Sequence, residues 1–539
     1  MAKKNSREID TDFLEPLKVR IPNPQRIAVS KHGMVATAHF RATDAGVEIL
    51  EGGGNAIDAA VAAAFTLGVC EPQASGLGGQ TMMLIHKVDD DVGTIALDGS
   101  SRAPSRAVID DLEEKSSRRL GYTASTVPST PATLAYALER YGTLSFDKVL
   151  AFPIKLAEEG YQITELQHRL QKRELKNFKK GNAGEIFLKN GEKPLPVGSL
   201  FKQPILAKTL RRLAEKGVED FYSGEIAEAI HKDMQEKGGF IQMDDLAQIP
   251  YPLEREPLTC RFGNMYVSTM PPPGAGRTLV EMLNILRKFP AADRNPDTPE
   301  GALLLAEVIK QAQLDRRDRP FDPNFYPQVQ DRRMVSRNYA KIVSEQIRSR
   351  IGGGGETTHL SVMDRHGNVV ALTQSIERVY GSKIVTPELG FLYNDYMCAF
   401  DYEDMSHPYY LRPNAVPWAS VAPTIIFRSK RPWLAIGSPG SDRITSTIVQ
   451  ILLRLARQSP FDAVAAPRLH CTFDGKVSLE ASYFRDDIPK LLKQRGFTID
   501  VREPMSFYLG CVQMVLFEGD ELVGVADPRR DGSAGGPSN

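Results

Sequence analysis

The stretch GGGGETTHLSVMDRHGNVVALTQS, residues 352–375, places four consecutive glycines directly before two segments that have the pattern of strands. β-Branched and other apolar residues alternate on either side of an Asp-Arg-His-Gly-Asn turn, which predicts a β-hairpin. The glycine run is the most flexible kind of backbone, whereas a hairpin strand is well ordered. The flexible glycine run and the first predicted strand meet at the adjacent threonines Thr357 and Thr358.

A threonine at this junction has a specific chemical use. Its hydroxyl becomes an effective nucleophile when the residue is a chain N-terminus, because its own α-amino group then supplies the base. The unperturbed α-amino pKa is about 7.7–8.0, so a useful fraction is neutral at cellular pH. The glycines would let the hydroxyl of Thr357 attack the carbonyl of Glu356 and cut the chain there. From these residues alone, a plain glycine loop before a hairpin is an equally good interpretation.

The rest of the chain has predicted strands near both ends and helices between them. Residues 42–69 contain two helical runs separated by glycines, and the second is so rich in alanine that it should pack closely on a sheet. Residues 71–107 are predicted to contain a loop and a strand hairpin, and residues 130–235 are mostly helical. Residues 254–286 follow a strand, turn and helix pattern, and 418–440 predict two more strands. This order favours an α+β fold with antiparallel sheets between outer helices, an αββα arrangement.

Composition limits the class of protein. The chain has 539 residues, of which 42% are hydrophobic, and it carries 67 basic and 67 acidic residues. The length predicts one large or two closely packed lobes, and the zero net charge argues against a general nucleic-acid binder. Without a run of about 18 apolar residues or a signal-peptide pattern, we expect no membrane contact and a cytoplasmic location. Residues 1–30, which are polar with several prolines, are expected to form an arm.

Other candidate motifs point to structure more than to chemistry. The five cysteines are scattered without Cys-x-x-Cys spacing, so we expect neither a disulfide framework nor a zinc site, and no metal or cofactor. The glycines of 76–80 precede a strand and therefore predict a tight turn instead of a phosphate-binding loop. His359 follows Thr357 by two residues and would share its strand face. A polar core contact is favoured for His359 over a role as general base.

Several ordered segments carry a resemblance to one family. Residues 357–375 resemble the start of the small subunit in the γ-glutamyltranspeptidase family, N-terminal-nucleophile hydrolases that are made as self-cleaving proenzymes. Four further segments are similar to landmarks of the same family. They are GGGNAIDAAVAAAFTLGVCEPQASGLGG (52–79), STMPPPGAGRTLVEMLNIL (268–286), GSPGSDRI (437–444) and VADPRR (525–530).

The resemblance implies a division of the chain and a catalytic set. Residues 1–356 would form a large subunit and residues 357–539 a small one, held together as a heterodimer in a four-layer αββα sandwich. Further dimerisation is left open. Thr357 matches the family nucleophile, and Ser375 falls where the family places a hydroxyl that contacts it. The oxyanion hole would come from backbone N–H groups in the turn that contains Gly440 and Ser441; one such donor is worth roughly 3–4 kcal/mol in acyl transfer.

The residues expected to recognise a glutamyl group agree less well with the family. The arginine that grips the α-carboxylate is shifted by two positions, to Arg102, and only Ser420 remains of a serine pair. Ala399 stands where an aspartate normally holds the α-amino group, and Glu377 replaces an asparagine. Loss of a buried charged partner costs several kcal/mol of recognition. Asp395 or Glu377 remains an alternative binder for an amine.

The implied activity is hydrolysis or acyl transfer of a small amide through an acyl-Thr357 ester. The substrate would be a γ-glutamyl compound such as glutathione, or a related amide. Two alternatives remain open at this point: an oxamate- or acylase-like amidohydrolase with a divergent pocket, and a catalytically silent scaffold.

Overall fold

The computed structural model describes residues 25–88, 93–107, 109–112, 114, 116–318, 336, 339, 357–480 and 486–538. The glycine run, Glu356 and the helices predicted towards Arg350 lie outside these residues. Among the described helices, none has the length and apolarity needed to cross a membrane.

The predicted hairpin is confirmed and lies at the centre of the molecule. Strands β12 (Thr358–Asp364) and β13 (Val369–Ser375) pair antiparallel, with Leu360 opposite Leu372, and every residue of both strands is buried. Their β-branched and apolar side chains suit a strand that is covered on both faces. Thr357 immediately precedes β12, so the position of the strand fixes the position of the threonine.

Two seven-stranded antiparallel sheets form the core. The first, the β12 sheet, contains in spatial order β21 (Ser533–Gly535), β2 (Gly33–Thr37), β12, β13, β3 (Gln80–His86), β4 (Thr94–Gly99) and β9 (Leu253–Arg255). The second, the β15 sheet, contains β1 (Ile27–Ser30), β20 (Glu521–Ala526), β19 (Gln513–Glu518), β15 (Arg431–Gly437), β14 (Thr424–Arg428), β11 (Met265–Thr269) and β10 (Leu258–Phe262).

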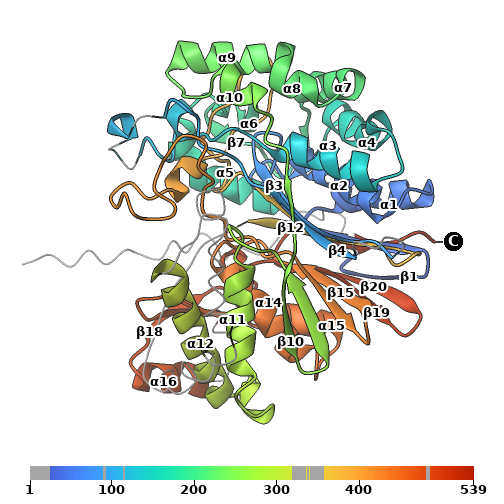
Figure 1. The fold of residues 1–539 in the computed structure, drawn as a ribbon, viewed down its shortest axis with the longest axis vertical. Coiled ribbons are helices and arrows are strands. Elements are labelled where there is room, and N and C mark those ends of the chain that lie inside the picture. Colours follow the sequence, from blue (N-terminus) through green and yellow to red (C-terminus); the bar gives the residue numbers. More distant parts are fainter. Residues whose placement is uncertain are drawn as a thin grey trace, which may run out of the picture.

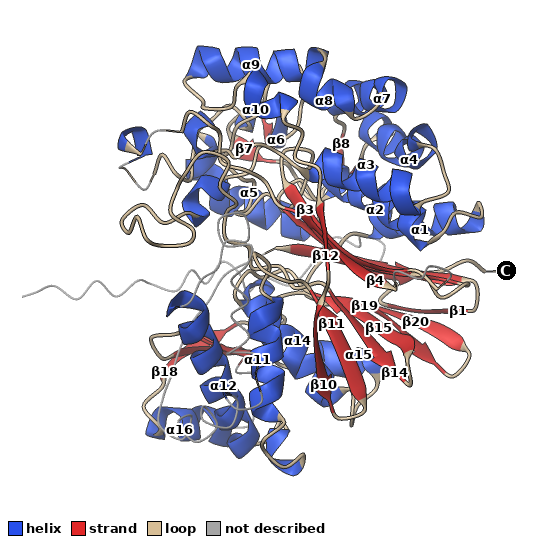
Figure 2. Cartoon of the chain, in the orientation of Figure 1, coloured by secondary structure: helices blue, strands red, loops and turns tan. Residues whose placement is uncertain are grey.

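The sheets pack face to face and helices cover their outer faces, which confirms the αββα prediction (Figures 1 and 2). The inner layer is rich in methionine and alanine, including Met34, Met82 and Ala435. The β12 sheet is covered by α1 (Phe40–Glu51), α2 (Ala56–Cys70) and α3 (Thr130–Tyr141). The β15 sheet is covered by α11 (Gly276–Leu286), α14 (Arg443–Arg454) and α15 (Pro460–Ala465), and α12 (Pro299–Asp318) packs on α11.

Helix α2 lies against β12 and β13, as its alanine content predicts. Asn55 caps its first turn, and the Asp58 carboxylate accepts a hydrogen bond from the Asn55 backbone N–H, which completes a capping box. Nearly every side chain of the helix is buried, so small residues are needed on all sides. This close packing places the C-terminal end of α2 beside the first residues of β12.

The remaining elements are further helices and small accessory sheets. The helices are α4 (Phe146–Glu159), α5 (Glu165–Phe178), α6 (Gly184–Phe187), α7 (Pro204–Lys216), α8 (Glu219–Ser223), α9 (Glu225–Lys237), α10 (Met243–Ala247) and α16 (Asp487–Gln494). The short strands are β5 (Tyr161–Gln162), β6 (Leu188–Lys189), β7 (Lys193–Pro194), β8 (Leu200–Phe201), β16 (Leu469–Cys471), β17 (Lys476–Glu480) and β18 (Thr498–Arg502).

Two local expectations are corrected. The arm predicted for residues 1–30 is wrong at its end, because Ile27–Ser30 form β1 and pair with β20, burying Ala28. The single strand predicted within 254–286 is a hairpin of β10 and β11, because Gly263, at φ +63°, allows a tight turn.

Candidate active site

Thr357 lies at the edge of a cavity of about 560 Å³. The residue is 6% exposed, and its carbonyl oxygen accepts a hydrogen bond from Arg530 Nη2 at 3.0 Å. Glu377 and Ser441 line the same cavity, which is called the Thr357 cavity below. This cavity therefore brings together Thr357, Ser441 of the predicted oxyanion turn and the candidate recognition residue Glu377.

A buried ion pair holds the start of β12 in place. Glu71, which caps the C-terminal end of α2, accepts a hydrogen bond from Thr358 Oγ1 at 2.6 Å. Its other oxygen is 2.9 Å from Arg530 Nη1, and both side chains are only 2% exposed. A buried carboxylate is tolerated when it is paired and hydrogen-bonded in this way. Sequence analysis gave neither Glu71 nor Arg530 a role, although both lie in segments that resemble the family.

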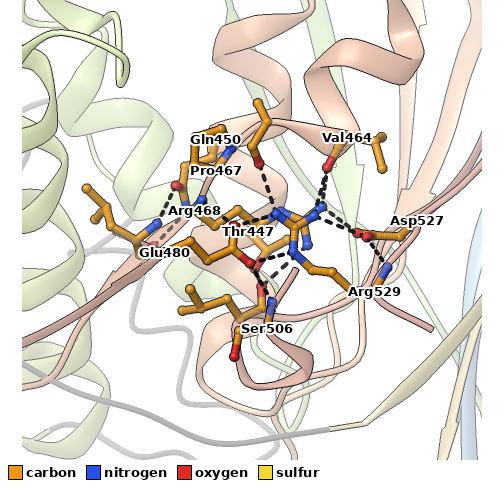
Figure 3. Close-up of polar contacts among 12 residues, drawn as sticks. Thr447, Gln450, Val464, Pro467, Arg468, Glu480, Ser506, Asp527 and Arg529 are labelled. Carbon is orange, nitrogen blue, oxygen red and sulfur yellow. Dashed lines mark hydrogen bonds and ion pairs between the residues drawn. The ribbon is translucent and has the colours of Figure 1, made fainter. Parts of the chain in front are cut away.

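Arg529, the residue before Arg530, belongs to a buried ionic network in the C-terminal part of the chain (Figure 3). Arg529 contacts Glu480 at 2.6 Å and Asp527 at 3.1 Å, and Arg468 also pairs with Asp527. All four of these side chains are fully buried. Burial alone would raise the pKa of Asp527, but the two guanidinium groups hold it below its usual value. The network therefore fixes the segment that carries Arg530.

The predicted oxyanion turn follows β15. Gly440 has φ +125° and Ser441 has φ +44°, so both lie in the left-handed region, which is uncommon for serine. Ser441 Oγ donates to Ser420 Oγ at 3.1 Å, a contact that holds this conformation. The backbone therefore accepts serine where the family pattern has glycine. The assignment of the two N–H groups as oxyanion donors stays a prediction.

Ser375 ends β13, and its hydroxyl accepts a hydrogen bond from the Glu377 backbone N–H at 2.8 Å. This bond shapes the turn that carries Glu377 towards the cavity. Ser375 is buried and is not among the side chains that line the Thr357 cavity. Its predicted contact with the Thr357 hydroxyl stays a prediction.

His359 is a polar core contact, as sequence analysis favoured. Its Nδ1 lies 2.9 Å from Thr373 Oγ1 and its Nε2 lies 3.0 Å from Ser361 Oγ. Complete burial lowers the pKa of His359 to about 3, so the ring is neutral near pH 7. A Cβ atom added to Gly437 would lie 2.3 Å from this ring, so the two sheets touch here.

Glu377 and Asp395 place two carboxyl groups near the cavity. Burial first, and the Asp395 carboxylate second, raise the pKa of Glu377 to about 8. Burial raises the pKa of Asp395 to about 6, against the opposing effect of Lys383. Asp395 is fully buried and accepts a hydrogen bond from the Arg378 backbone N–H at 2.9 Å. Glu377 is therefore mostly protonated near pH 7 and is a weak partner for an ammonium group.

A second cavity of about 450 Å³ adjoins the first through Glu377 and Ser441. It is called the Trp418 cavity, and its wall contains Ala399 and Ser420, so three of the positions that match glutamyl recognition do converge. Within this wall Arg316 is paired with Asp442 at 2.6 Å and with Ser420 Oγ at 2.9 Å. Arg316 also lies over the Trp418 ring, with its guanidinium carbon 4.9 Å from the ring centroid.

Arg102 does not join these residues. It forms a backbone bridge with Val127 and lines neither cavity. The register shift seen in the sequence moves this arginine away from the position that the family pattern requires. The cation that the structure does place beside Ser420 is Arg316, from α12, which sequence analysis did not identify.

The Thr357 cavity is strongly basic. Cationic side chains outnumber acidic ones six to two along its wall: Arg119, Arg173, Arg378, Lys383, Arg443 and Arg530 against Glu174 and Glu377. These cations come from segments far apart in the sequence, and only Arg443 and Arg530 lie in segments that resemble the family. Such a wall favours negatively charged groups.

Comparison with solved structures and known sequences places this geometry in a class. The fold superimposes on cephalosporin acylase from Bacillus halodurans with a TM-score of 0.87, at 27% identity, covering 98% of this chain and 99% of that one. With a buried threonine at the start of a central strand, this defines an N-terminal-nucleophile hydrolase fold. The family model described as gamma-glutamyltranspeptidase matches residues 42–536. The chain belongs to the γ-glutamyltranspeptidase family and is an enzyme of that family.

Two curated relatives with similar identity to this chain are named for different activities. The glutathione hydrolase proenzyme of Escherichia coli (strain K12) is 34% identical over 537 residues, covering 93% of this chain and 91% of the relative. The acylase ACY 1 proenzyme of Pseudomonas sp. (strain SE83) is 33% identical over 543 residues, covering 94% of each. Identity alone therefore does not choose between a glutathione hydrolase and an acylase.

Proposed function

We propose that this protein is an autoprocessing amide hydrolase and acyltransferase that works through an acyl ester on Thr357. The position of Thr357 carries the proposal: it immediately precedes the central strand β12 and shares a cavity with Ser441. The family membership and the description of relatives as proenzymes support the same reading.

Maturation would begin with the Thr357 hydroxyl. Its oxygen attacks the carbonyl carbon of Glu356, the peptide C–N bond breaks, and an ester forms while the nitrogen becomes the free α-amino group. Water then hydrolyses the ester. The products are a fragment of residues 1–356 and a fragment of residues 357–539 with a new N-terminal threonine.

Turnover would use the same hydroxyl with the liberated amine as its base. The α-amino group of Thr357 takes the hydroxyl proton as the oxygen attacks the substrate carbonyl, and it then passes the proton to the departing amine. The N–H groups of Gly440 and Ser441 would hold the negative charge that develops on the carbonyl oxygen. Water resolves the ester to an acid, or a second amine resolves it to a new amide.

The acyl group is proposed to be γ-glutamyl or a related small acyl group. Two observations favour a divergent acyl group, as in an acylase: Ala399 supplies no acid in the Trp418 cavity, and the raised pKa of Glu377 keeps this carboxyl largely uncharged near pH 7. An α-ammonium group would therefore find no strong partner at these two positions. A γ-glutamyl chromogenic amide turned over as efficiently as its glutaryl counterpart, which lacks only the amine, would contradict this preference.

The proposal is tested by mass spectrometry of the purified wild type and of the Thr357→Ala variant. We expect two fragments divided between Glu356 and Thr357 in the wild type, and one intact chain without amidase activity in the variant. Thr358→Ala is the matched control, which should still be cut because Thr357 keeps its hydroxyl. An intact wild-type chain that hydrolyses amides would overturn the proposal.

A further inference from the structure

A further cavity, of about 650 Å³, lies where the two large sheets meet at the end away from Thr357; it is called the Tyr266 cavity below. Its wall combines the β3–β4 hairpin of the β12 sheet with β10, β11 and β14 of the β15 sheet. His86 ends β3 at this cavity, whereas Gln80, at the other end of β3, pairs with Ser375. Six residues of strand separate these ends, roughly 20 Å at about 3.3 Å per residue. The Tyr266 cavity is therefore separate from the reaction centre.

Strand β10 presents a polar face to this cavity. Cys260 and Phe262 pack into the apolar layer beneath the outer helices. Because successive side chains of a strand alternate, Thr259 and Arg261 point the other way, and both line the cavity. Elsewhere the layer between the sheets is rich in methionine and alanine. The polar residues of β10 therefore replace packed core at this edge with a surface that suits a polar ligand.

Strand register places a cation beside two aromatic rings. Arg261 on β10 lies opposite Tyr266 on β11, and Tyr266 lies opposite Phe427 on β14. The ring centroids of Tyr266 and Phe427 are 6.4 Å apart, and His86 from the other sheet meets Phe427 edge-on at 5.0 Å. Tyr266 is 42% exposed, so part of its ring is open to a ligand. The row offers an aromatic surface with a guanidinium group at its end.

Lys430 adds a second positive charge at the rim. Ser429 and Lys430 form the two-residue turn between β14 and β15, with φ of +50° and +66°, which is uncommon for residues other than glycine. Both residues are exposed and line the cavity. Among the residues that the structure describes, no aspartate or glutamate lines it. The described wall therefore favours an anion.

We propose that the Tyr266 cavity binds a small aromatic acid, whose ring lies against Tyr266 and Phe427 and whose anionic group is held by Arg261 and Lys430. Aromatic rings pack well in offset or edge-to-face arrangements, and a guanidinium group donates two parallel hydrogen bonds to a carboxylate. The cavity volume lies within the range of roughly 300–1,000 Å³ that is typical of small-molecule sites. The inference goes beyond the proposed function, because no part of it uses Thr357.

The test titrates 2-naphthoate and the neutral 2-naphthamide into the full purified protein by calorimetry at low salt. We expect the carboxylate to bind about tenfold more tightly, as a charged hydrogen-bonded pair allows, and the difference to shrink as sodium chloride is added. Because the Thr357 cavity is also basic, variants must assign the binding. In Arg261→Gln/Lys430→Gln the two compounds should bind equally. Lys493→Gln/Arg495→Gln, which removes the same charges from exposed positions at the end of α16, is the matched control and should keep the preference.

Two further measurements locate the ring. Tyr266→Ala should weaken binding of both compounds, because each loses the same ring contact, whereas Tyr266→Phe should bind both as the wild type does. In hydrogen–deuterium exchange, 2-naphthoate should slow exchange of the backbone amides in residues 256–269, which contain β10 and β11.

Equal affinity of the wild type for both compounds would overturn the inference. So would a preference that survives undiminished in Arg261→Gln/Lys430→Gln, or unchanged exchange in residues 256–269. The uncut Thr357→Ala protein should show the same preference as the wild type. Failure of the proposed function would therefore leave this result readable, and equal binding by an active enzyme would refute the inference alone.

Discussion

Glu377 shows how burial at one residue changes the charge of the site. Its pKa is raised from 4.5 to about 8, first by burial and then by Asp395. The folded protein therefore holds a proton that the unfolded chain has released between these two values. By linkage, the contribution of Glu377 to stability falls as pH rises from about 4.5 through 8.

The Glu377→Gln variant tests this effect. Glutamine keeps the shape but does not titrate, so the variant should gain thermal stability relative to the wild type as pH rises from 5 to 9. Thermal unfolding midpoints at pH 5, 7 and 9 measure the difference. Glu403→Gln, at an exposed position, should show no such trend. A constant difference between Glu377→Gln and wild type across this range would contradict the raised pKa.

Sequence reasoning identifies site residues that lie in local motifs but not those that only the fold brings to the cavities. Thr357, Ser420 and Glu377 can be proposed from the sequence because each lies at a fixed position in a local motif. Arg316, Arg119 and Arg173 were missed because helices and loops far apart in the sequence bring them to the cavities. Arg102 was misplaced for the reverse reason, since a two-residue shift within its motif leaves the residue type but changes its location.

At the scale of elements, the end of α2, the start of β12 and the C-terminal segment are joined by Glu71 and Arg530. Removing Arg530 would leave Glu71 buried without its cation. We expect Arg530→Gln to lower the free energy of unfolding by roughly 3–5 kcal/mol and to slow cleavage at Thr357, because the Thr357 carbonyl also loses a donor. Chemical denaturation and the fraction of cut chain over time measure the two effects.

A double variant separates the effect of the unpaired Glu71 carboxylate from the effect of the lost Arg530 side-chain volume. In Glu71→Gln/Arg530→Gln no charge is left buried, so stability should recover in part relative to Arg530→Gln. A double variant that is less stable than the single one would contradict the view that the unpaired carboxylate causes the loss.

The contact between the two sheets at His359 and Gly437 makes a separate prediction. A methyl group at position 437 would overlap the His359 ring, and both backbones are held in sheets. Gly437→Ala should therefore destabilise the protein by about 1–3 kcal/mol through overpacking. A Gly519→Ala variant is the control for space, since a Cβ there meets nothing within 4 Å, although its φ of +64° adds some strain. The denaturation midpoint of Gly437→Ala should be clearly lower than that of Gly519→Ala, and equal midpoints would refute the steric argument.

At the scale of the whole molecule, each seven-stranded sheet contains strands from both sides of Thr357. β12 lies between β2 and β13, β13 pairs with β3, β1 pairs with β20, and β11 pairs with β14. The proposed fragments 1–356 and 357–539 therefore share their backbone hydrogen bonds across two continuous sheets. Neither fragment contains all the strands of either seven-stranded sheet.

We expect the cut protein to remain a single particle in native buffer. Size-exclusion chromatography coupled to light scattering should give the mass of both fragments together, and denaturant should be needed to separate them. The uncut Thr357→Ala protein provides the reference for the intact chain. Release of either fragment in dilute native buffer would contradict the interleaved arrangement as the source of their association.

The order of layers was predictable from the sequence, but the topology of the sheets was not. Hairpin patterns fix neighbours that are close in the sequence, such as β12 and β13. The pairing of β1 with β20, at opposite ends of the chain, depends on contacts that leave no local pattern, which explains why residues 27–30 were assigned to an arm. Fold class follows from periodicity, whereas long-range register does not.

Because both seven-stranded sheets combine strands from both sides of Thr357, folding must come before the proposed cleavage. Thr357 reaches its position only when β12 lies between β2 and β13, so the proposed cleavage would take place only in a chain that has already folded. A misfolded copy would keep its threonine nitrogen in an amide and stay inert. Self-cleavage would thus restrict activity to correctly folded molecules, because only these could generate the N-terminal threonine.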